Sequence, residues 1–361
     1  MSWHTVGYIL AGLIGLPFAA YWGLYAAMCL LWGVPRYQGP VSDHFDGVKF
    51  HNLEPTPELT LRSAISIRLI RRVFSKKDNT PEHPWSVWVD DPPQPPLPEH
   101  VEGLRVTFIN HATLLIQING LNILTDPHYS ERASPVSWGG PKRHRAPGVR
   151  FEDLPPIDVV ILSHNHYDHM DVPTLERLEQ AFHPRFVSAL GNPLFLKKIG
   201  IESAGLDWGD ALDVGHHVKV HAVRARHFSA RALNDRDNAL WCGFVLSGEA
   251  GNVYFAGDTA YAAHFSEIGK QFAPIRLALL PIGAYLPAEF MERAHISPQQ
   301  AVRAAEDLHA QDAIPMHYGT FRLSDEGMDE PVQDLQAALA LRGVSAPRFH
   351  VLKSGESWSA D

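Results

Sequence analysis

The chain is poor in cysteine and carries no excess of positive charge. Its 361 residues include two cysteines, Cys29 and Cys242, and neither stands in a C-x-x-C pair. A disulfide framework and thiolate metal sites are therefore excluded, so any bound metal must be held by imidazole and carboxylate groups. The net charge of -9 argues against a nucleic-acid partner, because phosphate binding needs a basic surface.

No internal repeat is evident, and the remaining composition is that of a globular protein, with 45% hydrophobic and 20% charged residues. The length suits one large domain with an appendage. The run D-D-P-P-Q-P-P-L-P-E at 90–99 is a stiff, extended connector and a natural boundary. We therefore predict a membrane anchor over 1–36, a basic, proline-rich extension over 37–100, and a main domain over 101–361.

The N-terminal stretch 6–34 contains no charged side chain. About 20 apolar residues suffice to span a bilayer as a helix, and aromatic residues stand near both ends of this run. A cleavable signal peptide is disfavoured, because no Lys or Arg precedes the run and the run exceeds the usual signal core. A buried core helix stays open as an alternative, and Pro17 suits neither structure fully. We predict a single span that anchors the protein, with the main domain on the cytoplasmic side because basic residues follow the span.

A second segment with an unusual charge pattern is L-T-L-R-S-A-I-S-I-R-L-I-R-R-V-F-S-K-K at 59–77, with six basic residues and no acid. Apolar residues recur every four positions, so a helix here would carry an apolar stripe beside a basic one. Such a helix would lie on an anionic membrane surface. A solvated helix packed on the main domain remains an equal alternative.

The main domain begins with short β-rich runs and continues with runs that alternate with amphipathic helical patterns. Strands are expected at Leu104–Asn110, Leu114–Ile118, Leu121–Thr125, Val159–Leu162, Phe186–Ala189, His217–Val223, Trp241–Leu246, Val253–Ala256, Leu277–Leu280 and Ala313–Pro315. Helices are expected at Val172–Phe182, Ala263–Gln271, Pro298–Leu308 and Val332–Leu341. This order predicts an α/β sandwich whose helices cover the sheets.

Histidine is abundant, with 21 residues, and three of them stand in the stretch S-H-N-H-Y-D-H-M-D at 163–171. This stretch joins an expected buried strand to an expected helix, which is where active sites gather in α/β proteins. His164 and His166 stand two apart and can point toward one metal. Asp168 and His169 are adjacent and can converge on a second point nearby. A chance loop of solvated histidines is the alternative that this compact spacing disfavours.

Three further residues stand just past expected strands and can complete the coordination. They are His227, Asp258 in F-A-G-D-T, and His317 in I-P-M-H-Y-G-T-F. His227 completes a three-imidazole site, His317 completes the second site, and Asp258 can bridge the two. We therefore predict seven ligands for two metal ions: His164, His166, Asp168, His169, His227, Asp258 and His317.

This pattern resembles the metallo-β-lactamase superfamily. Several segments more closely resemble the N-acylphosphatidylethanolamine-hydrolysing phospholipase D group, in family order: T-F-I-N-H-A-T-L-L-I, L-T-D-P, G-P-K-R, F-A-G-D-T, P-I-G-A-Y, A-H-I-S-P-Q-Q-A, M-H-Y-G-T-F and V-L-K-S-G-E-S. The likeness covers 101–357, with weaker likeness at F-D-G-V-K-F. It implies an αβ/βα four-layer sandwich and a dinuclear site with two Zn²⁺. It also implies hydrolysis of N-acylphosphatidylethanolamine to N-acylethanolamine and phosphatidic acid.

The resemblance also implies roles for residues near the metals. Asp258 is expected to orient the attacking nucleophile, and His295 to bind the phosphate or protonate the leaving alkoxide. Asp126 is expected to support the ligand loop behind the metals. Two alternatives stay open: His295 can simply precede the helix cap Ser297, and Asp126 can cap a turn.

Substrate-facing positions are less well defined. Tyr167 and Phe228 are expected to line the substrate mouth, although Tyr167 can also merely pack. Ala294 stands where the animal enzyme is expected to have glutamine, and Phe228 where it has tryptophan, so substrate preference is in doubt.

The expected partners are a membrane phospholipid substrate and the membrane itself, with no nucleic acid, and a homodimer is left open. Rival functions on this scaffold are a lactonase or a different phosphodiesterase, since one fold hosts many chemistries. A non-catalytic membrane-anchored metal-binding protein is disfavoured by the complete ligand set. A diiron site is disfavoured by the three-imidazole half.

Overall fold

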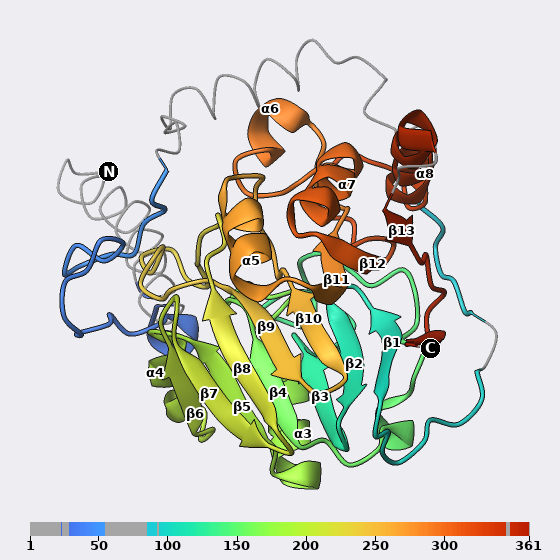
Figure 1. The fold of residues 1–361 in the computed structure, drawn as a ribbon. Helices are drawn as coiled ribbons and strands as arrows, with labels where there is room; N and C mark the ends of the chain where they lie inside the picture. The colour runs from blue at the N-terminus through green and yellow to red at the C-terminus, as the bar shows by residue number, and fades with distance from the viewer. Residues whose placement is uncertain (1–22, 24–28, 55–84, 92–93, 344–346, 361) are drawn as a thin grey trace, which may run out of the picture.

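A computed structural model of the chain describes residues 23, 29–54, 85–91, 94–343 and 347–360. Within them two seven-stranded β-sheets face each other (Figure 1), with strand orders β14-β1-β2-β3-β4-β5-β6 and β13-β12-β11-β10-β9-β8-β7. Strands β14 and β13 are edge strands of the first and second sheet, and β6 and β7 are the strands at the opposite edges. The sandwich of two sheets predicted from the sequence is confirmed.

The first sheet is antiparallel from β14 to β3 and parallel from β3 to β6. Its strands are β1 (Leu104–Asn110), β2 (Thr113–Ile118), β3 (Leu121–Thr125), β4 (Val159–Leu162), β5 (Arg185–Ala189), β6 (Ser203–Leu206) and β14 (Ser357–Ser359). The second sheet is parallel from β10 to β13 and antiparallel elsewhere. Its strands are β7 (Ala211–Gly215), β8 (Val218–Val223), β9 (Gly243–Gly248), β10 (Gly251–Phe255), β11 (Ile275–Pro281), β12 (Ala310–Met316) and β13 (Arg348–Phe349).

Helices lie on the outer faces of both sheets. The described helices are η1 (Phe151–Asp153), α3 (Val172–Phe182), α4 (Asn192–Lys198), α5 (His264–Phe272), α6 (Ala288–Met291), α7 (Pro298–Asp307) and α8 (Glu330–Arg342). Leu175 of α3 and Phe195 of α4 share a hydrophobic cluster with the first sheet. Phe265 of α5 and Val302 of α7 belong to the large core that also fills the space between the sheets.

The apolar run V-V-I-L in β4 shows why a continuous hydrophobic strand forms here. Val159 and Ile161 belong to the core between the sheets, whereas Val160 and Leu162 belong to the cluster under α3 and α4. Alternate side chains of a strand point to opposite faces, so a strand buried on both faces has no polar position. This burial holds β4 in the interior of its sheet, between β3 and β5, and fixes the start of the histidine-rich loop.

Of the predicted membrane span at 6–34, the structure describes only 23 and 29–34, and the basic stretch 59–77 lies wholly outside the described residues. In the part of the chain that the structure describes, no helix has the length and apolarity needed to cross a membrane. Residues 34–54, here called the N-terminal strap, pack on the sandwich, because Phe45 and Phe50 are buried in its main core.

Candidate metal centre

The predicted ligands follow strands whose carboxyl ends meet at one edge of the sandwich. Strand β4 runs parallel to β3 and β5, and β10 runs parallel to β11, which in turn is parallel to β12. The histidine-rich loop follows β4, Asp258 follows β10, and His317 is the residue after β12. Parallel strands place their carboxyl ends at the same edge of a sheet. The contact of His169, from the first sheet's loop, with Asp258, from the second sheet's loop, shows that these two edges meet.

The loop 163–171 is held in a tight turn by its own backbone hydrogen bonds and by the buried guanidinium group of Arg231. The amide of Met170 donates to the carbonyl of His166 at 2.8 Å. Arg231, only 6% exposed, donates from Nη1 to the carbonyls of Asn165 at 2.9 Å and Met170 at 2.8 Å. The loop therefore keeps its shape through backbone contacts, which leaves its imidazole and carboxylate groups free to face the centre.

The first donor group consists of His164, His166, His227 and Asp258, whose ligand atoms all lie within 4.8 Å of one another. Nδ1 of His166 lies 2.9 Å from Nε2 of His164 and 3.2 Å from Nε2 of His227. The structure thus brings together the three imidazoles that the sequence predicts for one site, although His227 stands 61 positions beyond His166.

Hydrogen bonds behind two of these rings decide which nitrogen faces the centre. Ser163 Oγ donates to Asp126 at 2.6 Å, so Nδ1 of His164 donates to this hydroxyl at 2.9 Å. Nδ1 of His227 donates to the carbonyl of Ala294 at 2.8 Å. The Nε2 atoms of both rings are therefore free of protons and can act as ligands, as is typical of metal-binding histidines.

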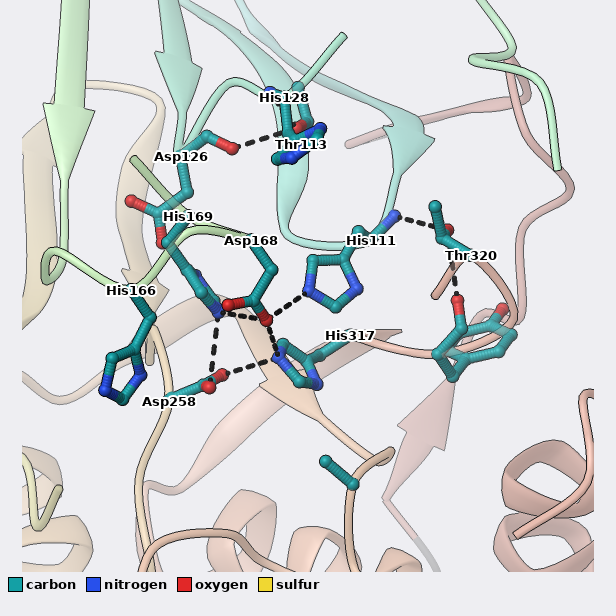
Figure 2. A network of polar contacts seen from close by, with 12 residues as sticks. His111, Thr113, Asp126, His128, His166, Asp168, His169, Asp258, His317 and Thr320 are labelled. Carbon is teal, nitrogen blue, oxygen red and sulfur yellow. Dashed lines mark hydrogen bonds and ion pairs between the residues drawn. The ribbon is translucent and has the colours of Figure 1, made fainter. Parts of the chain in front are cut away.

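The second donor group consists of His111, Asp168, His169 and His317, again within 4.8 Å of one another. Figure 2 shows these side chains converging from loops of both sheets. Oδ2 of Asp168 lies 3.0 Å from Nε2 of His111, 3.4 Å from Nε2 of His169 and 3.3 Å from Nε2 of His317. Asp168, His169 and His317 are the three residues that the sequence assigns to the second site.

Asp258 lies between the two donor groups. Its Oδ2 is 3.2 Å from Nε2 of His169, 3.8 Å from Nε2 of His227 and 4.0 Å from Nε2 of His164. Its Oδ1 is 3.2 Å from Nε2 of His317. A single carboxylate thus reaches ligands of both groups, which is the position that a bridging residue needs. Gly257 permits this turn, with φ of +59° and only 2.6 Å between a Cβ built there and Cβ of Ser163.

Asp126 is completely buried behind the histidine-rich loop. Its carboxylate accepts from the amide of Ser163 at 2.8 Å and from Nδ1 of His169 at 2.7 Å. Burial raises the pKa of Asp126, and the bonds from His169 and Ser163 oppose this rise. The contact fixes Nε2 of His169 toward the centre, so the side chain orients a donor instead of only capping a turn.

His295 lies at the rim of the centre, with Nδ1 3.7 Å from Oδ2 of Asp258 and its side chain 12% exposed. It also forms a donor group with Asp258 and His317. Ser297, two residues on, caps α7 through a capping box with Gln300. The helix cap and the site-facing histidine therefore coexist.

The two expected substrate-lining residues differ in their surroundings. The ring of Phe228 packs edge-on against His166 with centroids 4.4 Å apart. The hydroxyl of Tyr167 donates to the carbonyl of Arg231 at 2.7 Å, and the Arg231 guanidinium lies over its ring. Tyr167 also lines a cavity of about 310 Å³ together with Trp32 and Met170. Tyr167 therefore packs against Arg231 and also borders this cavity.

Burial keeps the three histidines of the first donor group neutral in the absence of metal. It holds the pKa of His164 well below its usual range, and neighbouring imidazoles add to this effect. Burial likewise lowers the pKa of His227 well below its usual value, against the opposing charge of Asp258, and lowers that of His166 to about 4. Neutral imidazoles carry the lone pairs that metal binding requires.

The second donor group balances charge differently. Burial acts to lower the pKa of His169, but Asp258 and Asp168 outweigh it, so the pKa lies well above its usual value. The same balance raises the pKa of His317 to about 9. Conversely, burial acts to raise the pKa of Asp168 and Asp258, but the charge of His169 and the contacts with the neighbouring histidines together hold both values well below the usual range. Without metal, protons on two histidines thus balance two buried carboxylates.

The donor chemistry fits divalent cations. Nε2 of His169, Nε2 of His317 and Oδ1 of Asp258 are buried and make no hydrogen bond, although they lie close together. Buried polar atoms normally have hydrogen-bond partners. Imidazole and carboxylate atoms that converge without bonding each other are arranged as ligands around a cation, with nitrogen and oxygen donors that suit zinc.

His111 is the member of this centre that the sequence analysis did not assign. It stands in the turn between β1 and β2 with φ of +46°, a conformation that is rare outside glycine. Its amide donates to Thr320 Oγ1 at 3.1 Å, and its carbonyl accepts from the amide of His317 at 2.8 Å. The only signal in the sequence was its place in the quoted segment T-F-I-N-H-A-T-L-L-I, because the contact with Asp168 spans 57 positions.

Replacing His111 with alanine is expected to lower metal affinity or activity by about 10- to 100-fold, because Asp168 loses the imidazole that orients it. Metal analysis after dialysis and an activity assay would measure the change. His100→Ala removes an exposed histidine outside the centre and should leave both quantities unchanged. Equal behaviour of the two variants would contradict a role for His111 at the centre.

The amino-acid sequence of this chain is similar to a known family and to named proteins. Residues 121–318 match the family described as beta-lactamase superfamily domain. The N-acyl-phosphatidylethanolamine-hydrolyzing phospholipase D 1 of Caenorhabditis elegans is 35% identical over 272 residues, which cover 72% of this chain and 76% of that protein. A mitochondrial N-acyl-phosphatidylethanolamine-hydrolyzing phospholipase D of Saccharomyces cerevisiae is 33% identical over 237 residues, covering 64% of this chain and 50% of that protein.

A solved structure gives the same fold. Igni18, a metallo hydrolase from the archaeon Ignicoccus hospitalis, superposes with a TM-score of 0.54 at 23% identity, covering 72% of this chain and 98% of that one. At this level of identity the likeness concerns the fold alone. The fold of the sandwich is therefore shared with a solved protein.

Proposed function

Because this chain belongs to the beta-lactamase superfamily, as its motifs indicated, we propose that it is a dinuclear zinc phosphodiesterase acting on a membrane phospholipid. The substrate that we propose is N-acylphosphatidylethanolamine, and the products are N-acylethanolamine and phosphatidic acid. The nematode and yeast relatives bear the name of this activity. The match spans only half of the yeast protein, so the activity of the whole chain is part of the proposal.

The observation that carries the proposal is the pair of donor groups around Asp258. His164, His166 and His227 would hold one Zn²⁺, and Asp168, His169 and His317 would hold the other, with Asp258 shared. When bound, a pair of such ions lowers the pKa of water and neutralises charge on a phosphodiester.

The protein's own residues supply orientation and proton handling. The carboxylate of Asp258 would orient the attacking water by accepting its hydrogen bond. His295, at the rim and within 3.7 Å of Asp258, would bind a phosphate oxygen or protonate the leaving alkoxide, since an imidazole suits either role. Phe228 and Tyr167 would border the path by which the lipid approaches.

A lipid substrate accords with the N-terminus of the chain. A span over 6–34 would keep the enzyme at the bilayer that holds its substrate, and tethering raises effective concentration. We propose that the main domain faces the cytoplasm, because basic residues follow the span. Protease protection of the main domain in sealed vesicles of known orientation would test this placement.

The function is tested by offering the purified full chain N-acylphosphatidylethanolamine, phosphatidylcholine and an acyl lactone, with metal analysis in parallel. We expect release of N-acylethanolamine, with slower or no turnover of the other two compounds. Preferential hydrolysis of the lactone would favour the rival lactonase. Full metal occupancy without release of N-acylethanolamine would contradict the phospholipase assignment.

A further inference from the structure

The metal centre has a contact from a part of the chain that none of the metal motifs includes. Asn52 stands at the end of the N-terminal strap, 175 positions before His227. Its Nδ2 donates to the carbonyl of His227 at 2.9 Å, and its Oδ1 accepts from the amide of His227 at 3.2 Å. One carboxamide therefore satisfies both backbone groups of a predicted metal ligand.

This double contact takes the place of a neighbouring strand. Strand β8 ends at Val223, and residues 224–230 belong to no strand. The backbone of Arg226 is bonded to the loop after β10, through Thr259 Oγ1 at 2.9 Å and the amide of Ala260 at 2.7 Å. His227 is only 2% exposed. Without Asn52 its amide and carbonyl would lose these partners inside the protein, which is unfavourable.

The strap is built to hold Asn52 in place. Its segment F-D-G-V-K-F forms a turn in which Asp46 accepts from the amides of Val48 and Lys49, both at 2.7 Å. Phe45 and Phe50 pair across this turn and are buried in the main core. The side chain of Asn52 is further fixed because Oδ1 also accepts from Nε1 of Trp241 at 3.2 Å, and Trp241 is itself 1% exposed.

The remaining contact of His227 completes the orientation. Its ring is held by the carbonyl of Ala294, which accepts from Nδ1, and its backbone is held by Asn52. Together these contacts determine where Nε2 points. Removal of a group that orients a metal ligand from behind typically lowers metal affinity by about 10- to 100-fold.

We propose that Asn52 is a positioning residue of the metal centre, holding the backbone of His227 so that its Nε2 faces the cation bound with His164 and His166. This inference rests on the metal-dependent hydrolase proposed above. The strap precedes the first strand of the sandwich in the sequence, and this role makes it a structural part of the metal centre.

The test compares metal binding by the full chain with that of Asn52→Ala. Metal-free protein is titrated with Co²⁺, and the visible absorption reports the coordination of each equivalent. We expect one of two equivalents to bind about 10- to 100-fold more weakly in Asn52→Ala, with an altered spectrum for that equivalent, while the other equivalent is retained. Unchanged affinity and spectrum would overturn the proposal.

Lys49→Met provides the matched control. Lys49 belongs to the same strap and donates from Nζ to Asn238 Oδ1 at 2.7 Å, on the loop beyond His227, without touching His227. Both equivalents should bind normally in this variant. If Lys49→Met weakened metal binding as much as Asn52→Ala, general docking of the strap would explain the effect and the positioning role would be refuted.

Asn52→Asp carries the test if the alanine variant does not fold. It keeps an oxygen that accepts from the amide of His227 but places a second oxygen against the carbonyl of His227, so a weakening of the same equivalent is expected. Equal metal binding by this variant and the unsubstituted protein would overturn the proposal. Because the readout is metal binding, a protein that binds two equivalents yet leaves the phospholipid intact would refute the proposed function alone.

Discussion

Asp258→Asn is expected to reduce hydrolysis by about 10³-fold or more and to weaken metal binding in both donor groups. The side chain keeps its shape, so packing is preserved, but the negative charge shared by the two groups is lost. Its oxygens lie 3.2 Å from Nε2 of His169 and of His317 and 3.8 Å from Nε2 of His227. Losing about 4 kcal/mol of charge stabilisation corresponds to this factor.

Steady-state kinetics and metal analysis of the same preparation would measure both effects. Asp153→Asn is the matched control, because Asp153 is exposed and its ion pair among the described residues is with the exposed Arg150, which is not part of the metal centre. Surface pairs of this kind contribute little to stability, so activity should be unchanged. Full activity and full metal content in Asp258→Asn would refute a bridging role for this carboxylate.

Removing the metal with a chelator is expected to abolish activity and to make stability decline as the pH rises above neutral. Without metal, the pKa of His169 lies well above its usual value and that of His317 is about 9. A raised pKa contributes stability that is fully present below the value of the unfolded chain, about 6.5, and is lost as the pH rises through the folded value. The window for His317 is therefore about 6.5 to 9.

The remaining histidines of the centre give the opposite slope in acid. Burial lowers their pKa, so the unfolded chain takes up protons that the folded protein excludes, and stability falls as the pH drops below about 6.5. These residues are His111, His164, His166, His227 and His295. The metal-free protein should therefore be most stable near pH 6.5, with declines on both sides.

Metal binding should displace the protons on His169 and His317, because a ligand nitrogen must be deprotonated. Calorimetric titration at pH 7.5 in buffers of different ionisation enthalpy should show release of about two protons per loaded protein. Thermal unfolding between pH 5.5 and 9 should show that metal removes the alkaline decline. The absence of proton release, with metal bound, would contradict this account of the second donor group.

Strong, regular patterns in the sequence predicted most elements of the sandwich. Strands β1, β3 and β4 and helix α3 have the predicted bounds. Strands β6 and β7 were not predicted. Strand β6 is the short segment S-A-G-L, and β7 is an edge strand whose residues are exposed or only half-buried. Such segments become strands through pairing with their neighbours, which local propensity does not record.

The residues of the metal centre also divide into those that a local sequence pattern indicates and those that only long-range contacts bring in. His164, His166, Asp168 and His169 stand in one short loop, so their spacing alone indicates metal binding. The turn that carries His111 and the strap that carries Asn52 contain no such spacing. They reach the centre only because sheet pairing and burial of Phe45 and Phe50 bring distant segments to the same edge.

By itself, therefore, the sequence determined the donor types, the strand-loop-helix context of the motif and the residues that follow each strand end. These depend on short-range periodicity and on the chemistry of single side chains. The sequence also predicted that Asp258 bridges the two sites and that Asp126 supports the loop, but only the tertiary structure decided which oxygen of Asp258 faces each histidine, that Asp126 accepts from Nδ1 of His169, and that Asn52 holds His227. The contact of Asp126 with His169 spans 43 positions and that of Asn52 with His227 spans 175. The orientation of the His227 ring depends in addition on the bond from its Nδ1 to the distant carbonyl of Ala294. The folded arrangement of two packed sheets sets such distances, and no local pattern encodes them.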